Sequence, residues 1–127
     1  MSTIVTVEGN LTGDPVLRTV PAREANDGER QVTNLRMAVS DRVRDASGEW
    51  VNTEALFYDV AVWGPAAAHA ARLSTGDRVV VHGDLRVRSY PSNAAGTEQL
   101  RHSPTITAAM IGASLRYADV HVTRADR

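Results

Sequence analysis

The sequence predicts an all-β fold, a small five-stranded Greek-key barrel with one short helix between its third and fourth strands. Three observations support this prediction. Several short segments alternate between apolar and polar side chains, as half-buried strands do. Clusters of proline, glycine, asparagine and aspartate separate these segments and mark turns. Only one stretch, rich in alanine, carries the signals of a helix.

The first two predicted strands are separated by a bend. Over residues 5–11, apolar side chains alternate with polar ones, which predicts a strand with one buried face. Asp14-Pro15 predicts the bend, after which residues 16–20 are extended again. Pro21 and Asn26-Asp27-Gly28 then predict a hairpin loop before the next strand.

The remaining elements follow from the same signals, and Pro65 and Gly76 mark the limits of the helix. We expect, in chain order, a strand at 32–40 with Leu35, Met37 and Val39 inward, a polar loop at 42–53, a strand at 55–63 and the helix at 64–73. After it we expect a long strand at 78–90 with Val79, Val81, Gly83, Leu85 and Val87 buried, a tip at 91–96, a return strand at 105–111, a break at 112–114 and an extended piece at 115–123. This order predicts an OB-type barrel, which binds oligonucleotides across one sheet face.

The strand at 55–63 is the most informative segment, because it holds three of the six aromatic residues of the chain. Its inward face is predicted to hold Tyr58, Val60 and Val62. Phe57, Asp59 and Trp63 fall on the opposite face. An unpaired buried carboxylate is costly, so we expect that face to be wet and both of its rings to be exposed. Exposed rings on a sheet stack unpaired bases, although a second apolar layer or a subunit interface is equally open on this strand alone.

Every basic residue of the chain is an arginine, whose planar group binds phosphate in a fork and stacks on bases. The predicted outward faces and the neighbouring loop carry Arg36, Arg42, Arg44, Arg86 and Arg88, and Tyr90 ends the last stripe. Rings interleaved with cations predict a groove for single-stranded nucleic acid, in which the rings stack bases and the cations follow phosphates. A solvated sheet edge is the alternative for the arginines.

Composition describes a single globular domain of 127 residues, with 43% hydrophobic and 23% charged residues. Without cysteine there is no disulfide or zinc–thiolate site. No apolar run is long enough to span a membrane, and the N-terminus lacks the features of a secretory signal, so we expect a cytoplasmic protein. The net charge of −1 does not by itself indicate binding to nucleic acid.

Little in the sequence supports catalysis. His82, Asp84 and Asp59 could converge on neighbouring strands as a metal or general-base site, but no second histidine or nucleophile lies at a useful spacing. Polar residues on a wet sheet face are the simpler interpretation. The glycines form no phosphate-binding loop. We therefore expect a protein that is not an enzyme and has neither a cofactor nor a metal.

Several motifs together resemble the bacterial single-stranded DNA-binding protein family over nearly the whole chain. They are Val7-Glu8-Gly9-Asn10-Leu11 with Asp14-Pro15 and Arg18, Asn34-Leu35-Arg36-Met37-Ala38-Val39-Ser40, Gly48-Glu49-Trp50, Thr53-Glu54-Ala55-Leu56-Phe57 with Val62-Trp63, and Gly83-Asp84-Leu85-Arg86-Val87-Arg88-Ser89-Tyr90. The resemblance implies an OB fold, a homotetramer and single-stranded DNA wrapped around it at the nucleoid, where it is protected during replication, repair or recombination.

The resemblance also implies roles for individual residues. The stacking positions of the family correspond to Phe57, Trp63 and Tyr90, and positions similar to its phosphate contacts are Arg18, Arg86, Arg88 and Arg101. Residues 1–112 would be the OB domain and residues 113–127 an extension. Residues 111–118 look like the extra C-terminal strand with which part of the family clasps a neighbouring subunit, and Tyr117 would anchor that strand.

Three departures from the family pattern are visible. Val43 lies near a position where the family often stacks an aromatic ring, and residues 73–76 lack the basic residues often found there. The chain ends at Arg127 without the acidic, phenylalanine-ended tip that recruits repair and replication proteins in most members. Recruitment through such a tail is therefore without support, and an auxiliary paralogue is favoured over the main replication protein.

Some alternatives stay open at this point. The rings would also stack RNA bases, since no reader of the 2′-hydroxyl can be identified from sequence. An OB module whose exposed rings form a protein interface is a third possibility. Trp50, in the predicted polar loop, either stacks a wrapped base or pins the loop to the barrel.

Overall fold

The computed structural model describes residues 2–21, 28–92 and 99–125, without the side chains of residues 90–92 and 99–101. The elements are β1 (Thr3–Leu11), β2 (Val16–Val20), β3 (Arg30–Val39), β4 (Arg42–Arg44), β5 (Trp50–Asn52), β6 (Leu56–Trp63), α1 (Pro65–Ala70), β7 (Arg78–Ser92) and β8 (Gln99–Ala113). The predicted loop at residues 26–28 and the tip at residues 91–96 lie largely outside the described part.

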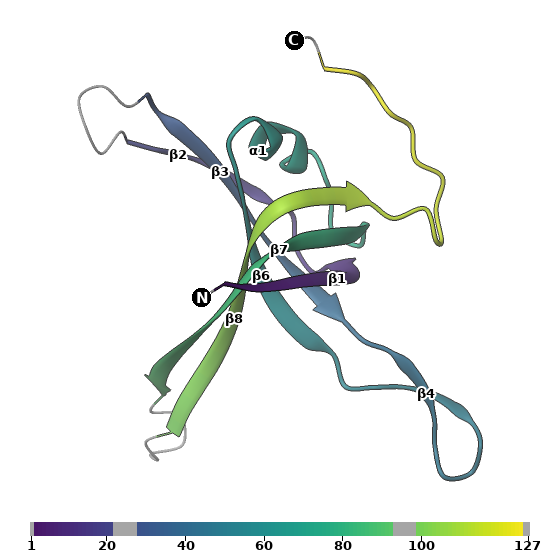
Figure 1. Ribbon diagram of the computed structural model, residues 1–127. Coiled ribbons are helices and arrows are strands. Elements are labelled where there is room, and N and C mark those ends of the chain that lie inside the picture. The colour runs from purple at the N-terminus through teal and green to yellow at the C-terminus, as the bar shows by residue number, and fades with distance from the viewer. Residues whose placement is uncertain (1, 22–27, 93–98, 126–127) are drawn as a thin grey trace.

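Five strands close into a barrel (Figure 1). Around the ring, β1 pairs with β3, β3 with β6, β6 with β8, β8 with β7, and β7 with β1. Only the pairing of β6 with β8 is parallel among these five. β2 follows the predicted bend and pairs with β3, and α1 lies between the third and fourth strands of the ring. The all-β, OB-type prediction is therefore confirmed.

The core lies on the inner faces of these strands. Met37, Val60, Val79, Val81 and Ile106 are each at most 1% exposed. Alternation therefore predicted the buried faces of β3, β6 and the first half of β7 correctly. On β6, Val62 is buried as well and Tyr58 packs against the same cluster, as predicted.

Two glycines allow strands to approach closely where the barrel closes. A Cβ atom on Gly9 would collide with the carbonyl oxygen of Ala38 on β3. A Cβ atom on Gly83 would collide with the carbonyl oxygen of Thr107, next to the irregularity in the pairing of β7 with β8. Both positions are buried in the wall of the barrel, so a larger side chain would require the backbone to move.

The prediction of a polar loop at residues 42–53 is wrong in part, because β4 and β5 form a hairpin in which Val43 pairs with Val51. Asp45 Oδ1 accepts hydrogen bonds from the Ser47 hydroxyl at 2.6 Å and from the N–H groups of Ser47 and Glu49 at 2.9 and 3.0 Å. The Ser47 hydroxyl, followed by the Glu49 N–H, holds the pKa of Asp45 below its usual value. The turn is thus organised by a side chain, and the hairpin projects from the barrel (Figure 1).

The predicted burial of Val87 is also wrong, since its side chain is 56% exposed. β1 begins at Thr3, which pairs with Leu85. Beyond Leu85, β7 pairs with β8 alone and extends past the barrel, so no core lies beneath Val87. β8 is correspondingly longer than the predicted return strand and begins at Gln99.

The chain after β8 forms no strand within the described residues up to 125. The extended element predicted at 115–123 is therefore absent from the single chain, and the predicted break at 112–114 falls partly within β8, which ends at Ala113. Leu115 and Val122 are 71% and 83% exposed. α1 ends at Ala70, three residues before the predicted end of the helix.

Candidate nucleic-acid interface

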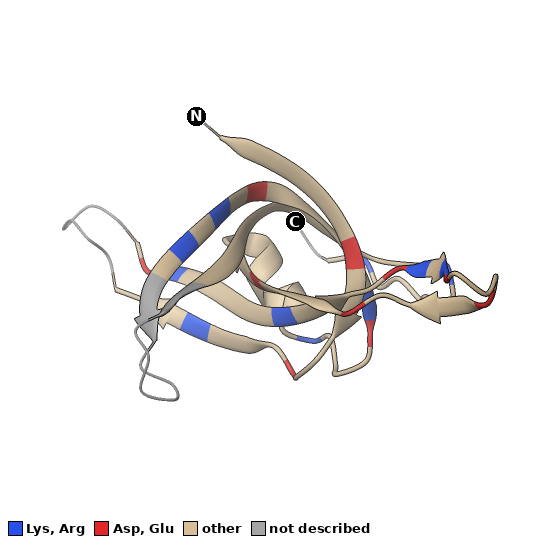
Figure 2. Ribbon diagram, turned by 90° about the horizontal axis from the view of Figure 1, so that it is seen from below, with Lys and Arg blue, Asp and Glu red and all other residues tan. Residues whose placement is uncertain are grey.

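The outer face of the sheet formed by β3, β6, β8 and β7 brings the predicted groove residues together. Arg36 pairs with Asp59, Asp59 with Thr105, and Thr105 with Arg86, so one row of outward side chains crosses four strands. The next row, at Leu35, Val60, Ile106 and Leu85, belongs to the core. Figure 2 shows basic residues following one another along the long arched strand and others on the strands beside it. The spacing of two along each strand therefore places the arginines on one surface.

Two of the three aromatic rings of β6, those of Phe57 and Trp63, lie on this outer face, and each has a guanidinium over it. Phe57 is 44% exposed, and the Cζ atom of Arg36 lies 5.0 Å from the centre of its ring. Trp63 is half-buried, which is less exposure than the sequence predicted, and the Cζ atom of Arg30 lies 4.5 Å from the centre of its ring. These cation–π contacts place flat rings and positive charges side by side on the solvent-facing side of the sheet.

Arg30 is a residue that sequence reasoning missed. It lies at the first position of β3, and Val32, two residues later, pairs with Trp63. The alternation of β3 places Arg30 and Val32 on one side of the strand. Finding Arg30 from sequence would have required the register between β3 and β6, which alternation within one strand does not provide.

Asp59 lies at the middle of the outer face and is exposed, as predicted. The Ser103 hydroxyl donates a hydrogen bond to its Oδ2 atom at 3.3 Å. Although Arg36 is its cross-strand neighbour, Asp59 forms no ion pair within the part of the chain that the structure describes. A negative charge therefore lies between Phe57 and Trp63 on β6, and Asp84 places a second carboxylate beside Arg86 on β7.

Arg18 reaches this face from β2. Its Nε and Nη2 atoms donate hydrogen bonds to Asn34 Oδ1 at 3.0 and 2.8 Å. Asn34 pairs with Ala61 of β6. The guanidinium of Arg18 is therefore bound to the residue of β3 that lies opposite Ala61. Arg18 pairs with Val32, which pairs with Trp63, and the Asn34 side chain holds its guanidinium; a phosphate contact at Arg18 stays a prediction.

Arg86 and Arg88 lie where β7 extends beyond the barrel, and both are exposed. Arg86 Nε is 3.6 Å from Asp84 Oδ2, but the Arg86 side chain is 81% exposed, which makes this a weak surface pair. Tyr90 and Arg101 face each other in the pairing of β7 with β8. The side chains of these two residues lie outside the described part, so their predicted contacts stay predictions.

Three further candidates, Arg42, Arg44 and Trp50, lie on the hairpin and not on the sheet face. Trp50 pairs with Arg44, whose Cζ atom lies 5.0 Å from the centre of the indole ring. Trp50 is 56% exposed and takes its cation from its own hairpin. The structure therefore separates the predicted site into a sheet face and a hairpin.

The side chains of His82, Asp84 and Asp59, which the sequence suggested as a metal or general-base site, each form a hydrogen bond to a different residue. Nδ1 of His82 is hydrogen bonded to the Thr6 hydroxyl at 2.7 Å, and Asp84 accepts from the backbone N–H of Thr3 at 3.2 Å. Among residues 2–21, 28–92 and 99–125, no three histidine, cysteine, aspartate or glutamate side chains are grouped as metal ligands would be. No helix in the same part of the chain has the length and apolar character needed to cross a membrane.

Comparisons with known proteins agree with this geometry. Residues 3–112 match the model of the single-strand binding protein family. A single-stranded DNA-binding protein of Mycolicibacterium smegmatis is 39% identical in an alignment that covers 98% of this chain and 72% of that protein. Single-stranded DNA-binding protein 2 of Streptomyces coelicolor is 37% identical, with 96% of this chain and 58% of that protein covered.

A solved structure is similar across nearly the same length. The crystal structure of the small single-stranded DNA-binding protein from Streptomyces coelicolor superposes with a TM-score of 0.74 at 30% sequence identity. The match covers 93% of this chain and 99% of that one. With a family model spanning residues 3–112 and relatives of this similarity, the chain belongs to the single-strand binding protein family.

Proposed function

We propose that this protein binds single-stranded DNA, largely without regard to sequence, and that it is not an enzyme. One observation carries the proposal: two rings and several guanidiniums share the outer face of one sheet in a member of this family. The names of the relatives, which describe single-stranded DNA-binding proteins, support the same ligand. The family is one of binding proteins, which supports the absence of catalysis.

The mechanism combines base stacking with phosphate contacts. Phe57 and Trp63 are six positions apart on β6, a separation of roughly 20 Å in an extended strand. Bases of a strand laid along β6 would stack on these rings, and Tyr90 would extend the stacking surface. Arg18, Arg36, Arg86, Arg88 and Arg101 would pair with phosphates, and the hairpin residues Arg42, Arg44 and Trp50 would meet the strand beyond the sheet. Every base has a flat face, so such binding discriminates little between sequences.

The proposal includes a homotetramer as the binding unit. Residues 1–112 would form the OB domain and residues 113–127 an extension that clasps a neighbouring subunit. The large exposed apolar side chains of the extension support this role, because contacts between subunits would cover them: Leu115, Tyr117, Val120 and Val122. Protection of DNA during replication, repair or recombination, in the cytoplasm at the nucleoid, belongs to the same proposal.

The test is a titration of the protein with oligothymidine, read by tryptophan fluorescence. Changing Trp63 to alanine should weaken binding by roughly 1–3 kcal/mol, the contribution of one stacked base. Trp63→Phe keeps a flat ring and serves as the control, with affinity close to that of the wild type. Because the variants differ in tryptophan content, a competition assay with labelled DNA should accompany the fluorescence.

Affinity should also fall as salt is raised, because binding of phosphates releases counterions. A wild-type protein that does not bind oligothymidine would contradict the function itself. Unchanged affinity of Trp63→Ala would remove that ring from the interface. Competition between oligothymidine and oligouridine of equal length separates DNA from RNA as the preferred ligand.

A further inference from the structure

A hollow of about 530 Å³ lies on the sheet face beside Asp59. Its wall includes residues 12–14 of the bend, Val16 at the start of β2, and Asn34 and Arg36 of β3. The volume falls within the roughly 300–1,000 Å³ that is typical of small-molecule sites in proteins. The sheet face therefore has room for a ligand at the position of its carboxylate.

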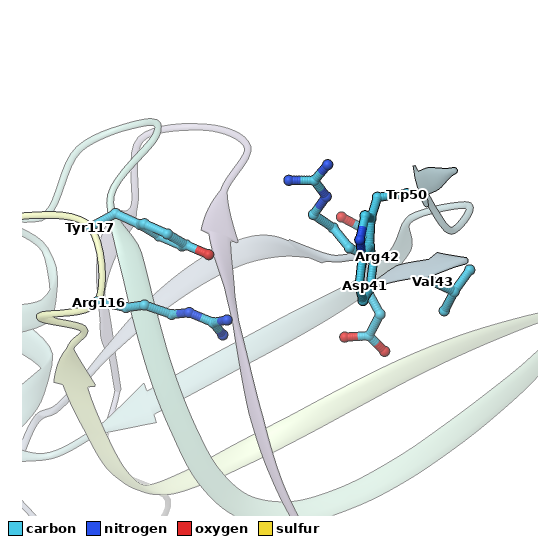
Figure 3. Close-up of a pocket in the computed structure, with 7 residues that line it drawn as sticks. Asp41, Arg42, Val43, Trp50, Arg116 and Tyr117 are labelled. Atoms are coloured by element: carbon cyan, nitrogen blue, oxygen red, sulfur yellow. The ribbon is translucent and has the colours of Figure 1, made fainter. Parts of the chain in front are cut away.

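A larger hollow, of about 730 Å³, lies between the hairpin and the segment that follows β8. Figure 3 shows Arg42 and Trp50 on one side of it and Arg116 and Tyr117 on the other. Arg116 and Tyr117 belong to the extension that would contact a neighbouring subunit, so the shape of this hollow would depend on the assembly. The described residues that line the hollow beside Asp59 all lie between residues 12 and 59, outside the extension.

The two carboxylates at the hollow on the sheet face differ in how they are bound. Asp14 Oδ1 accepts hydrogen bonds from the N–H and the hydroxyl of Thr75 at 2.9 and 2.8 Å. These bonds, that of the N–H first, hold the pKa of Asp14 below its usual value. Asp59 accepts one hydrogen bond within the described residues, from the Ser103 hydroxyl to Oδ2 at 3.3 Å. A carboxylate has about four acceptor positions, so Asp59 keeps most of its capacity to accept hydrogen bonds.

Asp59 also lies next to a ring on which a base would stack. Phe57 and Asp59 are two positions apart on β6, so their side chains emerge from one face roughly 7 Å apart. A base that stacks on Phe57 can therefore bring its edge to the Asp59 carboxylate. In a single strand that edge is unpaired and is free to form hydrogen bonds with a protein.

The four bases offer different groups to a carboxylate along this edge. Guanine presents two adjacent donors, N1–H and the N2 amino group, which match the two oxygens of a carboxylate. Cytosine and adenine each present one amino group beside an acceptor nitrogen, and thymine presents one N–H between two carbonyl oxygens. These neighbouring acceptors would repel the second carboxylate oxygen. Guanine is therefore the base whose edge is complementary to Asp59.

We propose that Asp59 accepts hydrogen bonds from guanine and gives one position of the groove a preference for this base. The inference rests on the proposed function and deepens it, because stacking admits every base whereas Asp59 selects among the bases that lie beside Phe57. The carboxylate repels phosphates, and charge-assisted hydrogen bonds offset this cost where the strand places guanine at the hollow. Oligothymidine, which carries no guanine, is then not the tightest ligand.

The test compares three strands of equal length: oligothymidine, the same strand with guanine at every third position, and the same strand with inosine in place of guanine. Inosine keeps N1–H and the carbonyl oxygen of guanine but lacks its N2 amino group. The wild type should bind the guanine strand about five-fold more tightly than the inosine strand, the lower end of the range for a bidentate base contact, because Asp59 is exposed. Equal affinities for these two strands would overturn the proposal.

Two variants locate the preference. Asp59→Asn should reduce it to less than about two-fold, since the carboxamide replaces one acceptor with a donor. Asp84→Asn removes the same charge from β7 and should keep the full preference. A preference that survives in Asp59→Asn, or that is lost equally in Asp84→Asn, would overturn the proposal.

Two further outcomes are distinct from these. An equal loss of affinity for all three strands in Asp59→Asn would overturn the proposal, since the side chain would then support the shape of the face and not read a base. If the wild type binds none of the three strands, the proposed function itself fails, and the failure is then not one of base preference.

Discussion

The two faces of β6 have opposite environments although their residues alternate in one strand. Val60 and Val62 are at most 2% exposed and pack in the barrel core. Phe57 and Asp59, on the same strand, are exposed on the outer face. The outer rings contact arginines, whereas Val60 and Val62 belong to the core cluster, against which Tyr58 also packs.

This contrast shows that an aromatic residue has a different use on each face of the same strand. Tyr58 fills space at the edge of the core, whereas Phe57 and Trp63 present flat surfaces beside positive charge. Changes on the inner face should therefore act on stability, and changes on the outer face on binding. Substitutions on the two faces of the barrel wall test that separation.

Ile106→Ala should lower the free energy of unfolding by about 2–5 kcal/mol, because it leaves a cavity in a core position that is fully buried. Ile106 pairs with Val60, so the cavity would open against the inner face of β6. Urea denaturation measures the loss, and Thr107→Ala, at the next and exposed position, is the control with a change within about 0.5 kcal/mol. The separation of faces would break down if folded Ile106→Ala bound oligothymidine many-fold more weakly than the wild type.

Phe57→Ala should weaken binding of oligothymidine by roughly 1–3 kcal/mol, since it removes one stacking ring. The urea midpoint should change far less than in Ile106→Ala, because Phe57 is 44% exposed. Phe57→Tyr retains the ring and should bind as the wild type does. A large fall in stability together with normal affinity would show that Phe57 belongs to the fold and not to the interface.

Arg36→Gln should weaken binding by less than about 1 kcal/mol at moderate salt, through loss of a phosphate contact and of the cation above Phe57. The slope of the logarithm of affinity against the logarithm of salt should become less steep by about 0.7, the value for one phosphate of a single strand. Arg72→Gln removes an exposed charge just beyond α1 and should leave the slope unchanged. An unchanged slope in Arg36→Gln would exclude a phosphate contact at this position.

Asp59→Asn should strengthen binding of oligothymidine by roughly 0.2–1 kcal/mol, the smallest effect of the series, because an exposed carboxylate on the face repels phosphates. Asparagine has nearly the same shape, so the change isolates the charge. The gain should shrink at high salt, where charges are screened. Weaker binding in Asp59→Asn would mean that the carboxylate accepts a hydrogen bond from thymine.

Alternation within single strands was sufficient to predict the barrel and to place Phe57, Asp59, Arg36 and Arg86 on one outer face. The reason is that the period of two is a property of the extended backbone itself. The helix between the third and fourth strands was predictable as well, because proline and glycine mark its limits. These features depend only on neighbours along the chain.

The features that were missed depend on partners far away in the sequence. The exposure of Val87 follows from the position where β1 begins, and the contact of Arg30 with Trp63 follows from the register of β3 against β6. The hairpin of β4 and β5 was missed because its strands have three residues each and almost no buried side chain. Its order comes from hydrogen bonds to the side chain of Asp45.

The way in which the ring of strands closes has a consequence for how the protein folds during synthesis. β6 and β7 each need β8 as a neighbour, and β1 needs β7, so strands from the first and last parts of the barrel must meet. Such non-local pairing slows folding. Until the residues of β8, which ends at Ala113, have emerged from the ribosome, β1, β3 and β6 have an unpaired strand edge and an exposed apolar face. The nascent chain is therefore most vulnerable to aggregation just before its last strand emerges.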